Sequence, residues 1–310
     1  MKPRQLLYFI IPCLVWGSTW YAIKFQLGRV DPLVSVVYRF FLAGILLIAF
    51  SLIRKLNMKF SFQEHLRMVL QGVILFGFNY WLVYLAEENL ASGVVAVIFS
   101  FSIFANIFFN FLLLKGKIKR EVMWGAVLGI AGTLLIFSHE LQNADQMSIG
   151  FLALMYCFGS IILASLGNIL SKYNQTRKLP VIQTNAFSMT YGSIAMMLMV
   201  PLSGRAFSIE ISPGYIGSLL YLSVFGSIVA FTFYLKLVGD IGPDRAGYST
   251  LIAPVIALVI SSFFENYQWG MAAVFGVLLL FAGNFLALKM NTIKFRRNED
   301  NPKPGKVAMG

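Results

Sequence analysis

The chain has 310 residues, of which 58% are hydrophobic and only 12% charged, and its formal net charge is +12. A soluble globular protein has roughly a quarter of its residues charged, so this composition excludes a soluble protein of this size. The basic residues fall almost entirely into alternate short loops, which is how membrane orientation is encoded, and this placement argues against nucleic acid as a partner.

Apolar runs of about twenty residues recur along the chain, each long enough to cross a hydrocarbon core roughly 30 Å thick. We predict membrane-spanning helices at 6–27, 33–53, 68–86, 92–114, 122–138, 149–171, 181–202, 214–236, 246–264 and 270–289. The connecting loops are short, so sequence neighbours are expected to pack as antiparallel hairpins. The first run is too long for a signal peptide and lacks a small-residue cleavage pattern, so we expect it to be retained.

The distribution of Lys and Arg predicts the topology of this all-α polytopic membrane protein. With the N-terminus inside, the inner loops and tails hold twenty-one of the 25 basic residues, and the outer loops hold only Arg29 and Arg205. Both termini are therefore predicted to be cytoplasmic. Five helices in each half place the second half in the opposite sense, which predicts two inverted five-helix repeats. We assign the first repeat to 1–143, the second to 144–290, and a disordered cytoplasmic tail to 291–310.

Several features that other functions require are missing from the sequence. No G-x-x-x-x-G-K-[ST] phosphate loop occurs, which disfavours ATP-driven pumping by this chain alone. The two cysteines, Cys13 and Cys157, lie inside apolar runs, so neither a structural disulfide nor a metal site is expected from them. We expect no cofactor and no enzymatic activity.

Polar and aromatic side chains within the apolar runs are the candidate substrate-binding residues. Each polar group costs free energy at membrane depth unless it faces a partner or a wet cavity. The alternative is interhelical hydrogen bonding, worth about 0.6–2 kcal/mol per bond. Because such residues recur in both halves, the set favours a polar central cavity, with candidates Trp16, Thr19, Tyr80, Tyr84, Asn106, Asn168, Asn185 and Tyr248.

Two basic residues lie inside predicted helices. Lys24 is one turn from the outer end of the first helix, where snorkelling to the outer headgroups explains it. Arg39 lies about two turns inside the second helix, where snorkelling and a role in a cavity or gate remain alternatives. A guanidinium there is a candidate anion anchor, for a substrate carboxylate or for an outer carboxylate such as Glu87.

The acidic residues indicate how transport would be driven. All thirteen Asp and Glu fall in loops, tails or helix ends. A proton-driven carrier usually needs an ionisable relay at membrane depth, and none is evident. The sequence therefore favours facilitated passage or a less direct coupling.

Several motifs resemble the EamA family of the drug/metabolite transporter superfamily. They are Trp16-Gly17-Ser18-Thr19-Trp20 with Lys24, Arg39-Phe40, Asp240-Ile241-Gly242-Pro243-Asp244-Arg245-Ala246, Ala253-Pro254-Val255 and Phe264-Glu265-Asn266-Tyr267-Gln268-Trp269. The resemblance covers essentially 6–289 and implies ten helices in two inverted repeats around a central pathway. It also implies export or exchange of amino acids, related metabolites or drugs. Lys115-Gly116-Lys117 departs from the Gly-Glu that many relatives carry there.

Together these observations favour a bacterial inner-membrane transporter, secondary-active or facilitative, that exports amino acids or similar small metabolites by alternating access. Its expected partners are a small-molecule substrate and membrane lipid, and a homodimer remains open. Multidrug efflux is the alternative within transport, since the chain holds 29 Phe, although a bilayer also selects Phe. A lipid-modifying membrane enzyme is the alternative from another class, but it would need an acidic or histidine cluster at an interface.

Overall fold

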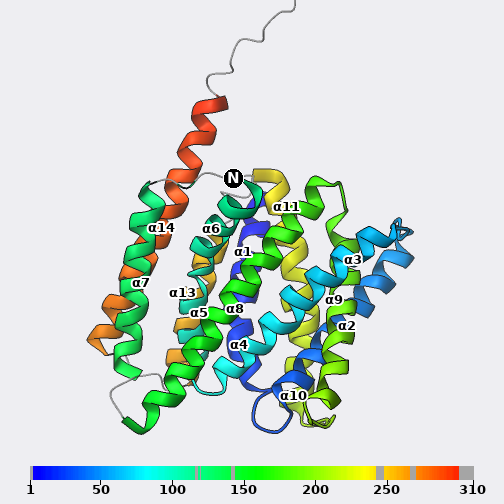
Figure 1. Ribbon diagram of the computed structural model, residues 1–310, viewed down its shortest axis with the longest axis horizontal. Helices are drawn as coiled ribbons and strands as arrows, with labels where there is room; N and C mark the ends of the chain where they lie inside the picture. Colours follow the sequence, from blue (N-terminus) through cyan, green and yellow to red (C-terminus); the bar gives the residue numbers. More distant parts are fainter. Residues whose placement is uncertain are drawn as a thin grey trace, which may run out of the picture.

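The computed structural model describes residues 3–115, 118, 120–140, 144–241, 248–265 and 270–299, and within them every regular element is helical. Figure 1 shows the helices as one bundle, in which the chain's N-terminus and the end of the last helix lie at the same end. In chain order the elements are α1 (Pro3–Lys24), α2 (Pro32–Ile53), α3 (Phe62–Gln71), the π-helix η1 (Gly72–Phe78), α4 (Asn79–Glu87), α5 (Ser92–Phe99), α6 (Ser102–Leu114), α7 (Arg120–Glu140), α8 (Ala144–Thr176), α9 (Val181–Leu202), α10 (Pro213–Tyr221), the π-helix η2 (Leu222–Val229), α11 (Ala230–Ile241), α13 (Tyr248–Phe264) and α14 (Met271–Glu299).

Each predicted span overlaps a helix, and several helices extend beyond their predicted bounds. Among the described residues, six helical runs are long and apolar enough to cross a membrane: Pro3–Lys24, Pro32–Ile53, Phe62–Glu87, Ser92–Leu114, Ser148–Thr176 and Pro213–Tyr234. Shorter apolar helices cover Val122–Ile136, Leu251–Phe264 and Met271–Ala287. α8 begins before the predicted 149 and ends after 171, and α14 continues to Glu299, beyond the predicted start of the tail.

Capping side chains mark the starts of α2 and α3. Asp31 caps α2 by accepting a hydrogen bond from the Leu33 amide at 2.8 Å, and a proline follows it. Ser61 and Glu64 form a reciprocal capping box, which starts α3 before the predicted residue 68. The amphipathic first turns of α3 were too polar to be included in the predicted span.

Two of the long runs contain a π-helical segment in the same relative place, between a short α-helix and the α-helix that follows it. In each, a side chain bonds a main-chain carbonyl of the widened turns: Asn79 Nδ2 donates to Leu75 O at 3.0 Å, and Ser227 Oγ to Leu222 O at 3.1 Å. π-Helical turns often lie at functional sites, which directs attention to the face that follows each of them.

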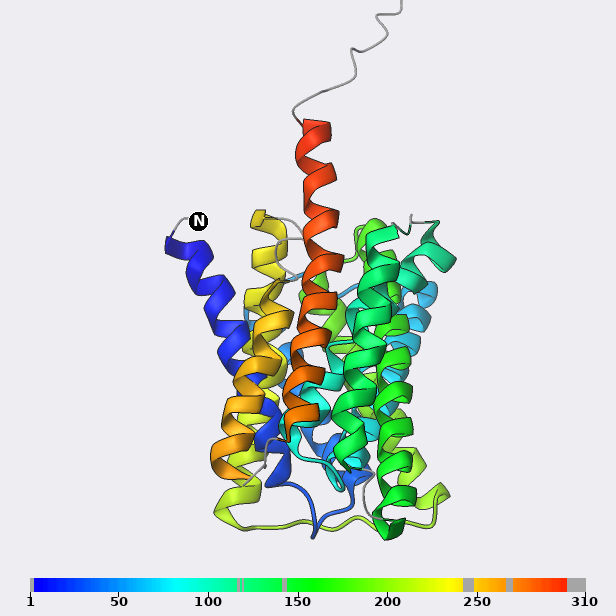
Figure 2. The ribbon, with the colours of Figure 1, turned by 90° about the vertical axis from the view of Figure 1, so that its left-hand side faces the viewer.

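Helix packing pairs elements from the two halves of the chain. α2 packs against α9 at one side of the bundle and α7 against α14 at the other, with α1 and α8 in the middle (Figure 1). α1 contacts α13 and α11, while α8 contacts α6 and α4. Figure 2 shows the α7–α14 side, where the helices run roughly parallel to one another.

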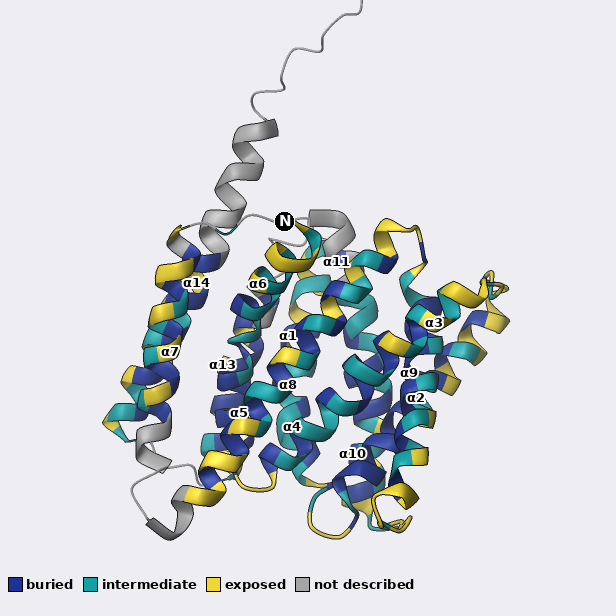
Figure 3. Ribbon diagram, viewed as in Figure 1, coloured by how far each residue is buried: buried dark blue, intermediate teal, exposed yellow. Residues whose placement is uncertain are grey.

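Many large apolar side chains are exposed on the bundle, as expected of a protein in lipid. Buried residues gather where helices face each other, and exposed residues lie on the outward faces (Figure 3). Two buried clusters meet at Trp20 and Phe99, whose ring centroids are 5.4 Å apart. At the crossing of η1 and α9, a Cβ on Gly72 would lie 2.0 Å from the Ser188 carbonyl oxygen, so only glycine permits this approach.

Candidate functional site

Arg39 is a buried cation in the apolar interior. Its side chain lies on α2 and is 2% exposed. The guanidinium carbon is 4.7 Å from the ring centroid of Tyr80 and 5.1 Å from that of Phe40. Such contacts contribute about 2 kcal/mol when desolvated, which is less than the several kcal/mol that burying a charge costs. Nε and Nη1 have no hydrogen-bond partner among the described residues.

Gly226 of η2 brings three of the predicted site residues around one point. A Cβ on Gly226 would lie 2.9 Å from Thr19 Cγ2 and 3.4 Å from Arg39 Nη2. The Gly226 carbonyl accepts a hydrogen bond from Trp16 Nε1 at 3.2 Å, and Ser223 Oγ donates to the Arg39 carbonyl at 3.0 Å. A missing side chain therefore lets η2, from the second half, reach α1 and α2 of the first half.

Aromatic rings surround this point and extend it toward α11. Trp16 contacts Phe231 and Tyr234, both with ring centroids 5.2 Å away. Phe76 of η1 lies 5.4 Å from Phe40 and 6.1 Å from Phe231. We call Trp16, Thr19, Arg39, Tyr80 and these neighbouring rings the Arg39 site. Sequence reasoning missed Gly226 and the phenylalanines, because Gly and Phe are abundant in any membrane helix.

Tyr84 lies one turn beyond Tyr80 on the same face of α4, as the spacing predicted. Its hydroxyl donates to Gln26 Oε1 at 2.6 Å, and both side chains are buried. Arg39 lies near enough to act on it electrostatically. Tyr84 thus adjoins the Arg39 site, and its hydroxyl donates to Gln26, which was not among the candidates predicted from the sequence.

The predicted asparagines form two groups of their own. Asn168 Nδ2 donates to Asn106 Oδ1 at 3.4 Å, and one turn on Lys172 Nζ donates to Asn110 Oδ1 at 2.9 Å. These four side chains make a polar seam between α6 and α8. The spacing of four residues on both helices could have revealed it, because equal spacing lets two rungs form.

Asn185 belongs to a buried chain of amides. Asn174 Nδ2 donates to Gln71 Oε1 at 2.9 Å, and Gln71 Nε2 donates to Asn185 Oδ1 at 3.3 Å. All three side chains are buried, and they tie α8, α3 and α9 together. Asn185 therefore takes part in an interhelical hydrogen bond, which was the alternative to facing a cavity. The side chain of Tyr248, the remaining candidate, lies outside the described residues.

Lys24 is held by the chain itself. Its ammonium donates to the Glu87 carbonyl and to the Leu90 carbonyl, the latter at 2.7 Å. The Glu87 carbonyl ends α4, where a cation is favourable, and the Leu90 carbonyl lies in the turn that leads to α5. Snorkelling to headgroups, which the sequence suggested, is therefore replaced by capping of a helix.

Glu87 ends α4, as the sequence indicated, but its carboxyl group is buried. Its side chain is 0% exposed, and neither carboxylate oxygen has a hydrogen-bond donor among the described residues. The sequence, in which no ionisable relay at membrane depth was evident, did not reveal this burial. The Arg39–Glu87 ion pair that was considered is not among the ion pairs of the described chain.

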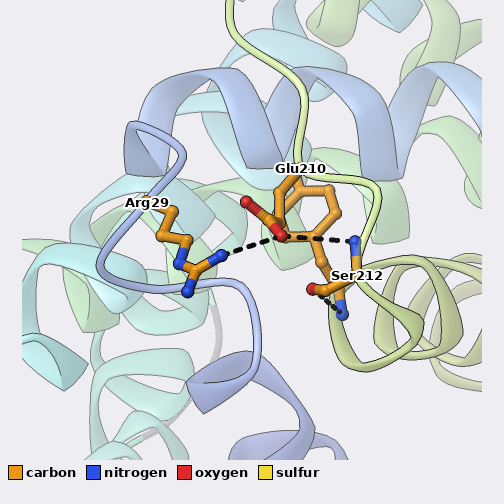
Figure 4. Close-up of polar contacts among 4 residues, drawn as sticks. Arg29, Glu210 and Ser212 are labelled. Atoms are coloured by element: carbon orange, nitrogen blue, oxygen red, sulfur yellow. Dashed lines mark hydrogen bonds and ion pairs between the residues drawn. The ribbon is translucent and has the colours of Figure 1, made fainter.

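At the same end of the bundle, two ion pairs join the loop after α1 to the loop before α10. Arg29 Nη1 lies 3.1 Å from Glu210 Oε1, and Arg205 Nε lies 2.9 Å from Asp31 Oδ2. Figure 4 shows that Glu210 also accepts from the amide of Ser212, at 3.3 Å. Desolvation opposes ionisation of Glu210, but the bonds from Ser212 and Arg29 prevail and lower its pKa.

Known proteins resemble the chain over most of its length. The sequence model of the EamA-like transporter family matches residues 4–138 and again 151–289. YedA of Escherichia coli, named an uncharacterized inner membrane transporter, is 27% identical over 283 residues, covering 88% of this chain and 89% of YedA. YoaV of Bacillus subtilis, an uncharacterized transporter, is 25% identical over 304 residues and covers 96% and 99%. Protein PecM of Dickeya dadantii is 23% identical over 293 residues, with 93% of each covered.

The fold also has a solved counterpart. A crystal structure that is 16% identical in sequence superposes with a TM-score of 0.65 and covers 96% of this chain and 100% of its own. That similarity concerns the fold alone. The two family matches and the apolar helices identify a multi-pass membrane protein, and the chain belongs to the EamA-like transporter family.

Proposed function

We propose that this chain is a multi-pass carrier of the bacterial inner membrane that exports amino acids or related small metabolites by alternating access. Ten helices in two inverted five-helix repeats, 1–143 and 144–290, would cross the membrane with both termini cytoplasmic. The membership of the family and the name of YedA as an inner membrane transporter support the location.

The packing pattern supports the inverted repeat. Exchanging the first five predicted spans for the second five exchanges α1 with α8, α2 with α9 and α7 with α14. The observed contacts survive this exchange, because α1 meets α13 and α11 as α8 meets α6 and α4. The two π-helices exchange in the same way: η1 packs against α9, and η2 against α2. A two-fold relation of this kind places a shared site between the halves.

The observation that carries the proposed substrate class is the state of Arg39. A buried guanidinium whose Nε and Nη1 have no acceptor among the described residues is incomplete without an anion. Carboxylates are the biological anions that match its planar donors best. In our proposal the substrate carboxylate binds Arg39, while Trp16 and Tyr80 contact the rest of the molecule and Thr19 and Tyr84 line the approach.

The asparagine seam supports a path from the Arg39 site toward the cytoplasm. Asn168 lies two turns before the end of α8 and donates a hydrogen bond to Asn106 of α6, yet its side chain is exposed. In our proposal Asn106 and Asn168 offer hydrogen bonds along this path, and Asn185 holds α9 in place. Tyr248 is retained as a candidate of the second half.

Counterflow in proteoliposomes tests the proposal. Vesicles containing the full chain are loaded in turn with unlabelled amino acids, and uptake of the labelled compound is measured for wild type, Arg39→Gln and Arg39→Lys. Arg177→Gln is the matched control, since Arg177 also lies over a tyrosine ring, at 5.4 Å, but is exposed. We expect exchange of one or a few amino acids in wild type and in the control, and at least a tenfold loss in both Arg39 variants.

The other outcomes distinguish the alternatives. If folded Arg39→Gln exchanged amino acids as fast as wild type, Arg39 would not be the anchor of a substrate carboxylate. The proposed substrate class would then be refuted. Silence toward every amino acid, combined with exchange of apolar cations, would favour multidrug efflux. Consumption of labelled lipid by the purified chain would instead indicate a membrane enzyme.

A further inference from the structure

Glu87 is a carboxyl group that the proposed transport cycle has not yet used. It ends α4, lies on the same face as Tyr80 and Tyr84, and is completely buried. Neither of its oxygens meets a donor within the described part of the chain. Buried side-chain acids in native proteins are almost always hydrogen-bonded or paired, so this group needs an explanation.

The cations near Glu87 are not bonded to it. Lys24 of α1 and Arg39 of α2 both lie near enough to act on the carboxyl electrostatically. Lys24 donates instead to main-chain carbonyls, and Arg39 stacks on the Tyr80 ring. Positive charge is therefore close to the carboxyl, yet none of it is bonded to the oxygens.

Two further titratable groups lie near Glu87. Glu265, which follows α13, is a second carboxyl group, and the Cys157 thiol of α8 is buried close enough to interact with Glu87. The Tyr84 hydroxyl, on α4 itself, gives its proton to Gln26. Within the described chain, no group from these helices supplies the hydrogen bonds that an ionised carboxylate would need.

The turn after Glu87 is clamped from both sides by charge. Lys24 bonds the carbonyls that end α4, and the Glu265 carboxylate accepts hydrogen bonds from the amide of Ser92, at 2.8 Å, and from its hydroxyl. A cation at the end of one helix and an anion at the start of the next each complement the helix dipole. This clamp holds the turn that follows Glu87 in place, at the end of the bundle where Arg29 pairs with Glu210 (Figure 4).

We infer that Glu87 is a proton-binding site that is occupied when the clamp is closed and releases its proton to water when the clamp opens. The neutral acid fits a dry site without donors, whereas the carboxylate requires water or a cation and so favours the open turn. The proton moves between the carboxyl oxygen and water, with no other group consumed. Closure of this end is therefore favoured by acid. Coupling of that proton to substrate flux rests on the carrier function proposed above, but the proton site itself does not.

Infrared spectroscopy of the full chain in lipid vesicles tests the proton site without any substrate. The C=O stretch of a protonated carboxylic acid is resolved from the bands of carboxylates. At neutral pH we expect this band in wild type and in Glu88→Gln, whose side chain is exposed, and its absence in Glu87→Gln, which imitates the neutral acid. The band should disappear in alkali as the clamp opens. Identical wild-type and Glu87→Gln spectra at neutral pH would overturn the inference. If Glu87→Gln fails to fold, Glu87→Asp should instead shift the band.

Flux in the same vesicles tests the coupling, using the amino acid that gives the largest counterflow. We expect an imposed pH gradient to change wild-type and Glu88→Gln flux at least threefold, and Glu87→Gln to retain exchange without responding to the gradient. An equal response of Glu87→Gln and wild type would refute the coupling while leaving carrier function intact. Loss of wild-type counterflow would refute the proposed function, and the infrared band would still decide the proton site.

Discussion

Substitution of Gly226 by alanine is expected to destabilise the contact between η2 and the first half of the chain. The new Cβ would lie 2.9 Å from Thr19 Cγ2, whereas carbon atoms pack best at about 3.5–4.0 Å. Either α1 or η2 must then move by roughly 1 Å, and overpacking of this kind costs about 1–3 kcal/mol.

Gly217→Ala is the matched control, because no atom lies within 4 Å of the Cβ that it would add. Both substitutions replace a helical glycine by alanine, which favours helix by about 1 kcal/mol in an α-helix, so their difference mainly reports the steric term. We expect Gly226→Ala to unfold at a lower temperature than Gly217→Ala when both are heated in the same detergent. Thr19→Ser removes the obstructing methyl group and keeps the hydroxyl, so the double variant should regain most of the loss.

Equal stability of Gly226→Ala and Gly217→Ala would refute a steric clash at Gly226. If Thr19→Ser did not restore the stability of Gly226→Ala, the methyl group of Thr19 would not be the obstructing group. A second readout follows from Arg39 Nη2, which lies 3.4 Å from the added carbon. Displacement of that nitrogen should weaken counterflow more than stability alone explains.

Three further outcomes are expected. Ser92→Ala, which removes a hydroxyl bonded to Glu265, should lower the unfolding free energy by about 1–3 kcal/mol, and unchanged denaturation in detergent would contradict the clamp. Because the pKa of Glu210 is lowered from its ordinary 4.5, the pair with Arg29 should contribute its stability above that pH and lose it only as pH falls through the depressed value. The difference in unfolding temperature between wild type and Glu210→Gln, measured against pH, should therefore stay constant down to pH about 4.5 and shrink below it. Asn168→Ala should slow counterflow without unfolding the chain, and undiminished transport would remove the asparagine seam from the path.

Apolar runs were sufficient to predict where the helices lie, although not where each begins. Each predicted span meets helix because a run of twenty apolar residues in lipid has no other way to pair its backbone. The start of α3 was the weakest prediction. Its boundary depends on Ser61 and Glu64, whose capping box outweighs the polarity of the first turns.

The candidate site was predictable only in part. Trp16, Thr19 and Arg39 could be found because a polar or bulky group in an apolar run needs a reason, and the fold does bring them together. Asn185 was found by the same logic but bonds Gln71, a residue at a helix end. Which asparagine meets a neighbour and which faces a cavity depends on how helices cross, and no spacing along the chain encodes that.

The burial of Glu87 could not have been predicted for a related reason. A residue at a helix end is exposed unless another segment covers it. Here Lys24, in the first predicted helix, and Glu265, just after the ninth, bond to the turn that follows Glu87. Lys24, Glu87 and Glu265 lie at the ends of different helices in the sequence, but they are neighbours in the folded chain.

The π-helical segments have a consequence for how the length of this chain is constrained. Each residue of an α-helix advances the chain by about 100° around the axis. One residue removed from 72–78 would therefore turn everything after it, so that the face of Tyr80 and Glu87 would point at a different neighbour. The same holds for 222–229 and the face of Phe231. The number of residues in each of these two segments therefore sets the rotation of the helix that follows. Deletions that the loops tolerate should prevent folding when made here.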